Sequence, residues 1–193
     1  MGFLDGILGR RAPVGPDLDA LFALPSAAIT LQASLDFVPT GRGSVAFRAP
    51  EGRAFADVEA DVRALLDADG GPPVEMAGDD FGFTWLVVRT DPAELPAAVT
   101  DVHAVNTTLV AAGFGPQLLC SLASFRGPGD EVLAMVYLFK RGTFYPFAPQ
   151  GGIDETSRRD SVLELRVRDL LAREMPLEAD TSRWFPVWSA PGL

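Results

Sequence analysis

Residues 118–139 read LLCSLASFRGPGDEVLAMVYLF, and this stretch decides the fold. It holds two apolar runs, residues 118–125 and residues 132–139, and each run has the length of a typical strand. A continuous apolar run bounded by turn residues is typical of a strand that is buried on both faces. The linking residues Gly127, Pro128, Gly129 and Asp130 favour a tight connection. The stretch therefore predicts two central strands joined as a hairpin.

The chain on either side of this hairpin alternates strand and helix patterns. Residues 29–37 alternate apolar with polar side chains, as a half-buried strand does. The other strands are predicted at residues 44–48, 73–76 and 83–89, and the helices at residues 17–24, 55–66, 91–113 and 162–171. A leading helix followed by successive strand-strand-helix units predicts an α+β fold. We expect an antiparallel sheet of about six strands with helices mainly on one face.

Two helix assignments leave alternatives open. Residues 162–168 alternate as a strand would, but Glu164 and Arg168 form a favourable i,i+4 pair and the residues are strong helix formers, so we predict a helix. The helix near residue 91 has a capping residue at Asp91. Pro96 favours a start one turn later.

The length of 193 residues is typical of one domain. We divide the chain into an amphipathic N-terminal segment and hinge, residues 1–16, and a single α+β domain, residues 17–193, with an aromatic C-terminal tail. The single cysteine, Cys120, cannot form an internal disulfide, which favours a cytoplasmic location.

The charge balance limits the possible partners. The chain carries 16 basic and 26 acidic residues, a net charge of −10, and nucleic-acid binders need positively charged surfaces. We therefore expect no nucleic-acid partner. We also expect no membrane span, because no stretch approaches the ~18–20 uncharged apolar residues that one needs.

The first eleven residues place apolar side chains on one side of a helical wheel and end in two arginines. This side predicts a docking element for a partner, or a contact with the membrane surface at the inner face. The residues concerned are Phe3, Leu4, Ile7, Leu8, Arg10 and Arg11.

Catalytic groups are scarce in the sequence. His103 is the single histidine, and Asp101 lies two positions away, on the wrong side of a helix to orient it. His103 and Asn106 are expected to have structural roles, with a polar role in a pocket as the alternative. The sequence predicts no catalytic residue, no metal site and no cofactor.

Two segments concentrate aromatic residues beside prolines. They read RGTFYPFAP at residues 141–149 and RWFPVWSAPGL at residues 183–193. Such segments either close the core or form an interface with a partner. The candidate residues are Phe144, Tyr145, Phe147, Trp184, Phe185 and Trp188.

Several stretches together resemble the PspA-associated protein B (PspAB) family, found in high-GC Gram-positive bacteria and other organisms. They are MGFLDGILGRR at residues 1–11, DLDALFALPSAA at residues 17–28, LLDADGGPPVE at residues 65–75 and the two aromatic endings YPFAP and RWFPVWSAPGL. The resemblance implies an accessory of the phage-shock, envelope-stress system that works with a PspA-type coiled-coil protein. A weaker resemblance, over about half the chain, is to the YbjN and type III secretion chaperone-like fold.

Three hypotheses about function follow. The first is a non-enzymatic cytoplasmic adaptor that binds a PspA-type partner or the membrane surface. The second is a small-molecule sensor or enzyme with a pocket lined by Trp85, Tyr137 and Tyr145. The third is a chaperone-like homodimer that presents its sheet to an unfolded segment.

Overall fold

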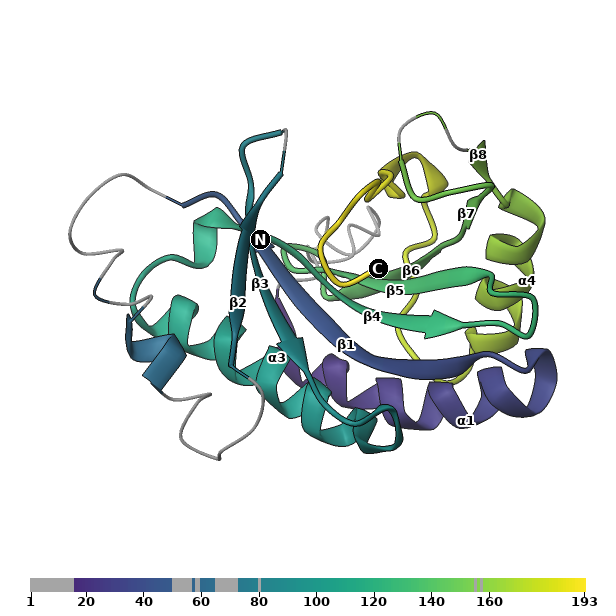
Figure 1. The fold of residues 1–193 in the computed structure, drawn as a ribbon, viewed down its shortest axis with the longest axis horizontal. Helices are drawn as coiled ribbons and strands as arrows, with labels where there is room; N and C mark the ends of the chain where they lie inside the picture. Colours follow the sequence, from purple (N-terminus) through teal and green to yellow (C-terminus); the bar gives the residue numbers. More distant parts are fainter. Residues whose placement is uncertain are drawn as a thin grey trace, which may run out of the picture.

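A six-stranded antiparallel sheet forms the centre of the molecule (Figure 1). The computed structural model describes residues 16–49, 57, 60–64, 73–79, 81–154, 156 and 158–193. The order across the sheet is β2-β3-β1-β4-β5-β6. The strands are β1 (Val38–Phe47), β2 (Glu75–Gly78), β3 (Thr84–Arg89), β4 (Leu118–Arg126), β5 (Val132–Leu138) and β6 (Thr143–Phe147), and a separate pair joins β7 (Pro149–Gln150) to β8 (Arg158–Arg159). The α+β prediction is confirmed.

The predicted hairpin of β4 and β5 forms and lies in the interior of the sheet, between β1 and β6. Its register runs from the pair Cys120 and Leu138 to the pair Arg126 and Val132. The turn closes through a hydrogen bond from the Gly127 amide to the Glu131 carbonyl, at 2.8 Å. Two central strands with a short connection therefore set the register for their neighbours.

Helices cover one face of this sheet, with α1 and α3 side by side below it in Figure 1. The helices are α1 (Leu24–Leu35), α3 (Leu95–Ala111) and α4 (Ser161–Leu171), with the 3-10 turns η1 (Leu18–Ala23), η2 (Pro92–Glu94), η3 (Gly115–Gln117) and η4 (Thr181–Arg183). Their apolar side chains and the facing side chains of the strands form the larger of two hydrophobic clusters. Residues 60–64 are also helical, and the rest of the helix predicted at residues 55–66 lies largely outside the described residues.

The predicted strand at residues 29–37 is wrong, because most of these residues belong to helix α1. The buried side chains Leu24, Ala27, Ala28 and Leu31 follow helical spacing, whereas Ile29 is 71% exposed. The period-two alternation was coincidental, and packing of the helical stripe against the sheet decided the outcome. The sixth strand is β6, which arises from the first aromatic segment.

The two open helix assignments are settled by the structure. α4 spans Ser161–Leu171, and the Asp160 side chain caps it by accepting a hydrogen bond from the Leu163 amide at 2.9 Å. The regular helix α3 begins at Leu95, one turn after Asp91, which caps η2 instead. The helix prediction at residues 162–171 is confirmed.

The segment Leu18–Leu35 is long and apolar enough to cross a membrane, since its mean hydropathy is 1.4 over 18 residues. The expectation that no stretch approaches a membrane span is therefore wrong for η1 and α1. In the described structure the inner side chains Leu21, Leu24 and Leu31 are part of the core beneath the sheet. The apolar character of this stretch thus serves its packing on the sheet.

Gly41 allows a test of the close approach between β1 and the chain that follows β3. A Cβ atom at Gly41 would lie 2.2 Å from the Thr90 carbonyl oxygen, and φ is +73°. We expect Gly41→Ala to lower the free energy of unfolding by about 3 kcal/mol or more, because left-handed strain adds to a backbone clash. Urea denaturation measures this loss.

Gly113→Ala is the matched control. Gly113 also has a positive φ, +88°, but nothing lies within 4 Å of the position that a Cβ atom would take there. We expect this substitution to cost only the strain of about 1–2 kcal/mol. Equal losses for the two variants would contradict the close approach of Gly41 to Thr90.

Candidate functional site

The C-terminal tail, residues 176–193, lies across the face of the sheet that the helices leave open (Figure 1). Trp184, Val187, Ala190 and Leu193 are buried there, between 4% and 8% exposed. They form the second hydrophobic cluster with side chains of the sheet, including Trp85, Cys120, Leu122, Val136, Tyr145 and Phe147. The tail is therefore docked, and much of its aromatic surface closes the core.

Hydrogen bonds fix the path of the tail at its start and midway along it. At its start the Phe144 amide donates to the Pro176 carbonyl at 2.8 Å, and the Glu178 amide donates to the Phe144 carbonyl at 2.7 Å. Further along, the Tyr145 hydroxyl donates to the Phe185 carbonyl at 2.7 Å. The segment thus adds a short parallel pairing to the edge of β6 and then turns onto the sheet.

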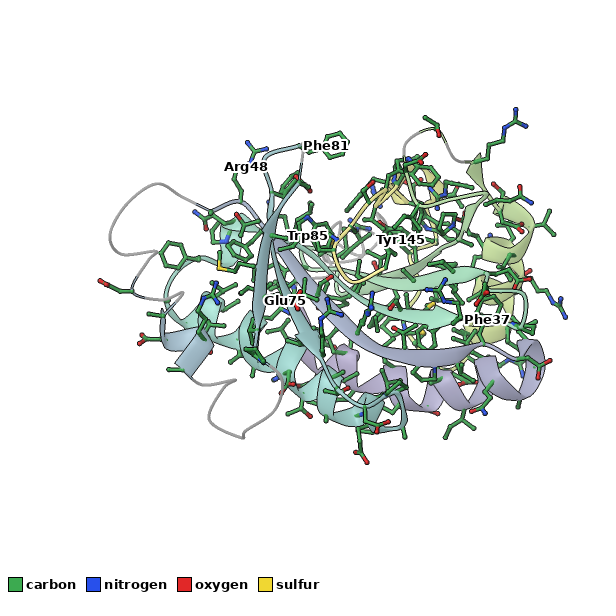
Figure 2. All side chains as sticks on the ribbon, viewed as in Figure 1. Phe37, Arg48, Glu75, Phe81, Trp85 and Tyr145 are labelled. Atoms are coloured by element: carbon green, nitrogen blue, oxygen red, sulfur yellow. The ribbon has the colours of Figure 1, made fainter. Side chains whose placement is uncertain are left out.

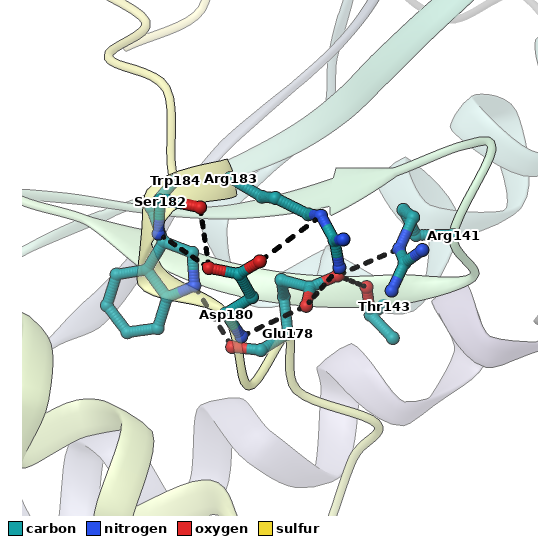
Figure 3. Close-up of polar contacts among 7 residues, drawn as sticks. All are labelled: Arg141, Thr143, Glu178, Asp180, Ser182, Arg183 and Trp184. Atoms are coloured by element: carbon teal, nitrogen blue, oxygen red, sulfur yellow. Dashed lines mark hydrogen bonds and ion pairs between the residues drawn. The ribbon is translucent and has the colours of Figure 1, made fainter. Parts of the chain in front are cut away.

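Glu178 is the centre of a polar cluster at this turn (Figure 3). Its carboxylate is 4% exposed and accepts hydrogen bonds from Arg141 Nε at 3.0 Å, Thr143 Oγ1 at 3.2 Å and the Asp180 amide at 3.1 Å. Arg183 Nη1 lies 3.5 Å from Oε1, the oxygen that accepts from the Asp180 amide. Burial raises the pKa of Glu178, but the Asp180 amide and Arg141 outweigh it, so the pKa lies below its ordinary value. The carboxylate is held in its charged form.

A second buried carboxylate, Glu164 of α4, supports the tail from the other side. It accepts hydrogen bonds from the Ala148 amide at 2.9 Å and from Arg159 Nε at 2.8 Å. Arg159 in turn donates through Nη1 to the Trp184 carbonyl. Burial raises the pKa of Glu164 and outweighs the effect of Arg159. The Arg159 side chain thus links helix α4 to the tail.

A hollow of about 300 Å³ opens between the tail and the β2–β3 hairpin. We call it the aromatic groove, and it is lined by Asp79, Phe81, Phe83, Trp85, Leu119, Phe185, Pro186, Val187 and Trp188. Phe81 at the outer end of the hairpin is 59% exposed, while Trp85 lies nearer the sheet (Figure 2). An apolar hollow with partly exposed aromatic side chains is typical of a binding site.

Hydrogen bonds and ring contacts hold both walls of the aromatic groove in place. On the hairpin, the Asp79 carboxylate accepts bonds from the Phe81 and Phe83 amides, at 3.0 and 2.8 Å, and from Trp85 Nε1 at 2.8 Å. On the tail, Phe185 packs edge-on with Tyr145 at 5.7 Å, and Trp188 packs edge-on with Phe147 at 4.9 Å between ring centroids. The groove is preformed, which lowers the entropy cost of binding.

Sequence reasoning named Trp85, Phe185 and Trp188 as candidates but missed Phe81 and Phe83 on the hairpin wall of the groove. The signal was the spacing of Phe81, Phe83 and Trp85 at alternate positions leading into β3. Local sequence patterns could not show that the tail packs beside these side chains.

The two polar candidates on α3 do not converge on one pocket. Asn106 is buried and donates through Nδ2 to the Val102 carbonyl and to Ser121 Oγ, both at 2.8 Å. His103 lies 3.4 Å from Asp19 and stacks at 4.9 Å on Phe22. Their contacts are to different elements, β4 for Asn106 and η1 for His103.

The predicted pocket of Trp85, Tyr137 and Tyr145 does not form. Tyr137 belongs to the cluster on the helix side, where its hydroxyl donates to the Asp17 carbonyl at 2.7 Å, whereas Trp85 and Tyr145 belong to the cluster under the tail. Phe144 also lies on the helix side, apart from the other five aromatic candidates. Successive side chains of a strand point to opposite faces of the sheet, so these aromatic residues lie on different faces. An interior cavity beside Ser121 has a volume of about 10 Å³, too small for a metabolite.

The remaining candidates concern the N-terminal segment and metal binding. Phe3, Leu4, Ile7, Leu8, Arg10 and Arg11 lie outside the described residues. Within the described part of the chain, no cluster of three or more His, Cys, Asp and Glu side chains could hold a metal ion. Burial raises the pKa of the Cys120 thiol, which disfavours the reactive thiolate.

Glu178→Gln tests the anchor of the tail. We expect a loss of roughly 1–2 kcal/mol in the free energy of unfolding at pH 7, because the charge-assisted hydrogen bonds to the buried carboxylate are weakened. The loss stays moderate because the side chains of Arg141 and Arg183 are 40% and 45% exposed and remain solvated. The pKa of Glu178 is lowered in the folded chain, so its stabilisation is complete above the ordinary value of 4.5 and disappears as the pH falls through the folded value. The gap between wild type and variant should therefore narrow below pH 4.5.

Urea denaturation across this pH range measures the gap. Asp169→Asn is a suitable control, because Asp169 pairs with Arg168 on the surface and its side chain is 69% exposed. If Glu178→Gln lowered the free energy of unfolding by the same amount at every pH, the loss would come from altered packing and not from the lost charge.

The family model of PspA associated protein B (PspAB) matches residues 1–192. No curated protein and no solved structure matches the chain. The matched range includes the β2–β3 hairpin and nearly the whole tail, the two walls of the aromatic groove. The chain therefore belongs to the PspA associated protein B family.

Proposed function

We propose that this protein is a non-enzymatic adaptor that binds a PspA-type coiled-coil protein through the aromatic groove. The observation that carries the proposal is the groove, where aromatic side chains remain partly exposed around a preformed hollow of about 300 Å³. Trp, Phe and Tyr are enriched among the residues that anchor protein interfaces. The family name supplies the class of partner.

The size of the groove favours a few side chains of a helix as the bound element. Coiled-coil proteins are long helices, and an amphipathic helix binds a groove through apolar residues spaced three or four positions apart. Phe81 and Pro186 are both exposed, one on each wall of the groove. A helix lying across the groove would cover both.

The groove is better suited to this role than the other surface hollows. A larger hollow, with a volume of about 550 Å³, lies between the β4–β5 turn and the β7–β8 pair. The described residues that line this hollow include no aromatic side chain. Its walls carry Arg126, Asp130, Glu131 and Asp160. Such a polar rim contributes little binding energy compared with a buried aromatic anchor.

The two alternative functions have less support. A chaperone-like dimer would present a free sheet face, but helices cover one face and the tail covers the other. A small-molecule sensor or enzyme would have to use the aromatic groove, whose volume is at the lower end of the range of ligand pockets. Binding of a metabolite there in place of a protein is an outcome that the experiments below detect.

We place the adaptor in the cytoplasm, at the inner face of the membrane when its partner is there. The N-terminal residues 1–16 act in this proposal as a second docking element. Four apolar side chains and two arginines bind a membrane only weakly by themselves, so the groove supplies most of the partner affinity.

Phe81→Ala tests the groove. We expect about tenfold or greater weakening of binding to the PspA encoded in the same genome, because an exposed aromatic anchor is lost without disturbing the core. Purified proteins and surface plasmon resonance measure the change. Phe22→Ala is the matched control, since Phe22 is 48% exposed on η1, away from the groove. Equal effects of the two variants would contradict the assignment of the groove.

Deletion of residues 1–11 tests the second docking element. We expect the truncated protein to co-sediment less with PspA-coated anionic vesicles, because the weak membrane contact is lost, while it retains most of its binding to PspA in solution through the groove. Unchanged co-sedimentation with both PspA and bare anionic vesicles would remove residues 1–11 from the mechanism. A thermal-shift response to a metabolite combined with no PspA binding would favour the small-molecule function instead.

A further inference from the structure

Charge distinguishes the aromatic groove from an ordinary apolar hollow. Asp79 is the one charged group among the described residues that line it. Five aromatic side chains, Phe81, Phe83, Trp85, Phe185 and Trp188, complete most of the lining. Aromatic faces carry negative electrostatic potential, so rings and a carboxylate together attract a cation. The net charge of −10 adds a long-range attraction of the same sign.

One ring of the groove already binds a guanidinium from within the chain. The Arg48 guanidinium carbon lies 5.2 Å from the centroid of the Phe83 ring, within the range of cation–π contacts. Arg48 and Phe81 both lie at the outer end of the β2–β3 hairpin (Figure 2). The surroundings of the hairpin therefore suit a cation, since the Arg48 guanidinium is already held there.

Asp79 can still interact with an incoming cation. One carboxylate oxygen accepts bonds from two backbone amides and the other accepts the Trp85 indole, which makes three donors among the residues that the structure describes. A carboxylate has about four lone-pair positions, so these three donors leave one of them for a further donor. All three of these donors are neutral, and the negative charge of Asp79 is therefore not cancelled by a cation among them.

We propose that the aromatic groove binds an arginine side chain of the partner, with its guanidinium stacked on the exposed rings and its charge directed toward Asp79. The proposal rests on the proposed function and specifies the partner chemistry at the same site. Arginine fits better than lysine, because a planar and weakly hydrated guanidinium stacks on aromatic faces. An apolar anchor would fill the same volume but would make no use of Asp79.

The test compares two probes of nearly identical shape. Nα-acetyl-arginine N-methylamide carries the guanidinium, and the corresponding citrulline derivative replaces it with a neutral urea. Titrations of the ¹⁵N-labelled full chain follow the indole Nε1–H resonances of Trp85 and Trp188. We expect the arginine probe to shift both resonances and to bind roughly three- to tenfold more tightly than the citrulline probe.

Phe81→Leu separates ring stacking from apolar contact. Leucine keeps an apolar side chain at a position that is 59% exposed, so the fold is expected to survive. We expect the arginine probe to lose most of its advantage over citrulline in this variant. Phe22→Leu, the same change at an exposed phenylalanine elsewhere, should leave the advantage intact. Trp188→Leu repeats the test on the opposite wall.

The outcomes distinguish this inference from the proposed function. Capture of PspA through the groove, with equal binding of the two probes, would overturn the arginine assignment and leave the adaptor function in place. A clear preference for arginine without PspA capture would support the cation site and contradict the PspA-type partner. Equal preference for arginine in wild type and in Phe81→Leu would also overturn the inference, since the rings would then have no part in it.

Discussion

The buried carboxylate of Glu178 restricts where the C-terminal tail can lie. Taking a charged group out of water costs several kcal/mol unless its oxygens are hydrogen-bonded. Arg141 and Thr143 satisfy it from the start of β6, and the Asp180 amide and Arg183 satisfy it from the tail (Figure 3). Both sets of donors meet Glu178 only when the tail turns at the edge of β6. The positions of the aromatic residues that follow depend on this turn.

The sheet is covered by two different kinds of structure as a result. Helices α1, α3 and α4 bury one face through regular apolar stripes. The tail buries the other face with little regular structure, and its backbone groups bond to side chains such as Tyr145 and Arg159. This covering is incomplete beside residues 185–188, where the aromatic groove lies between the tail and the β2–β3 hairpin.

The proposed adaptor function depends on this incomplete covering. Fully buried aromatic side chains stabilise the fold, and only partly buried ones can contact a partner. Trp184 is 5% exposed and belongs to the first kind, whereas Phe81 is 59% exposed and belongs to the second. Core closure therefore describes Trp184, whereas the interface role is the one we propose for Phe81 and for the partly exposed Phe185 and Trp188. Asp79 adds the charge that gives such a surface a preference among partners.

The sequence by itself determined the α+β class, the central β4–β5 hairpin, helix α4 and the family. Each depends on local signals, such as continuous apolar runs, caps and helix-forming residues, or on a motif that covers the chain. Tertiary structure decided what local signals left ambiguous. Residues 29–35 alternate like a strand, but Leu31 and Leu24 pack on the sheet as one helical stripe, and β6 is a strand because β5 offers it hydrogen bonds. The aromatic groove joins residues 79–85 to residues 185–188, about a hundred positions apart, and no local pattern specifies a contact whose energy comes from burial between distant segments.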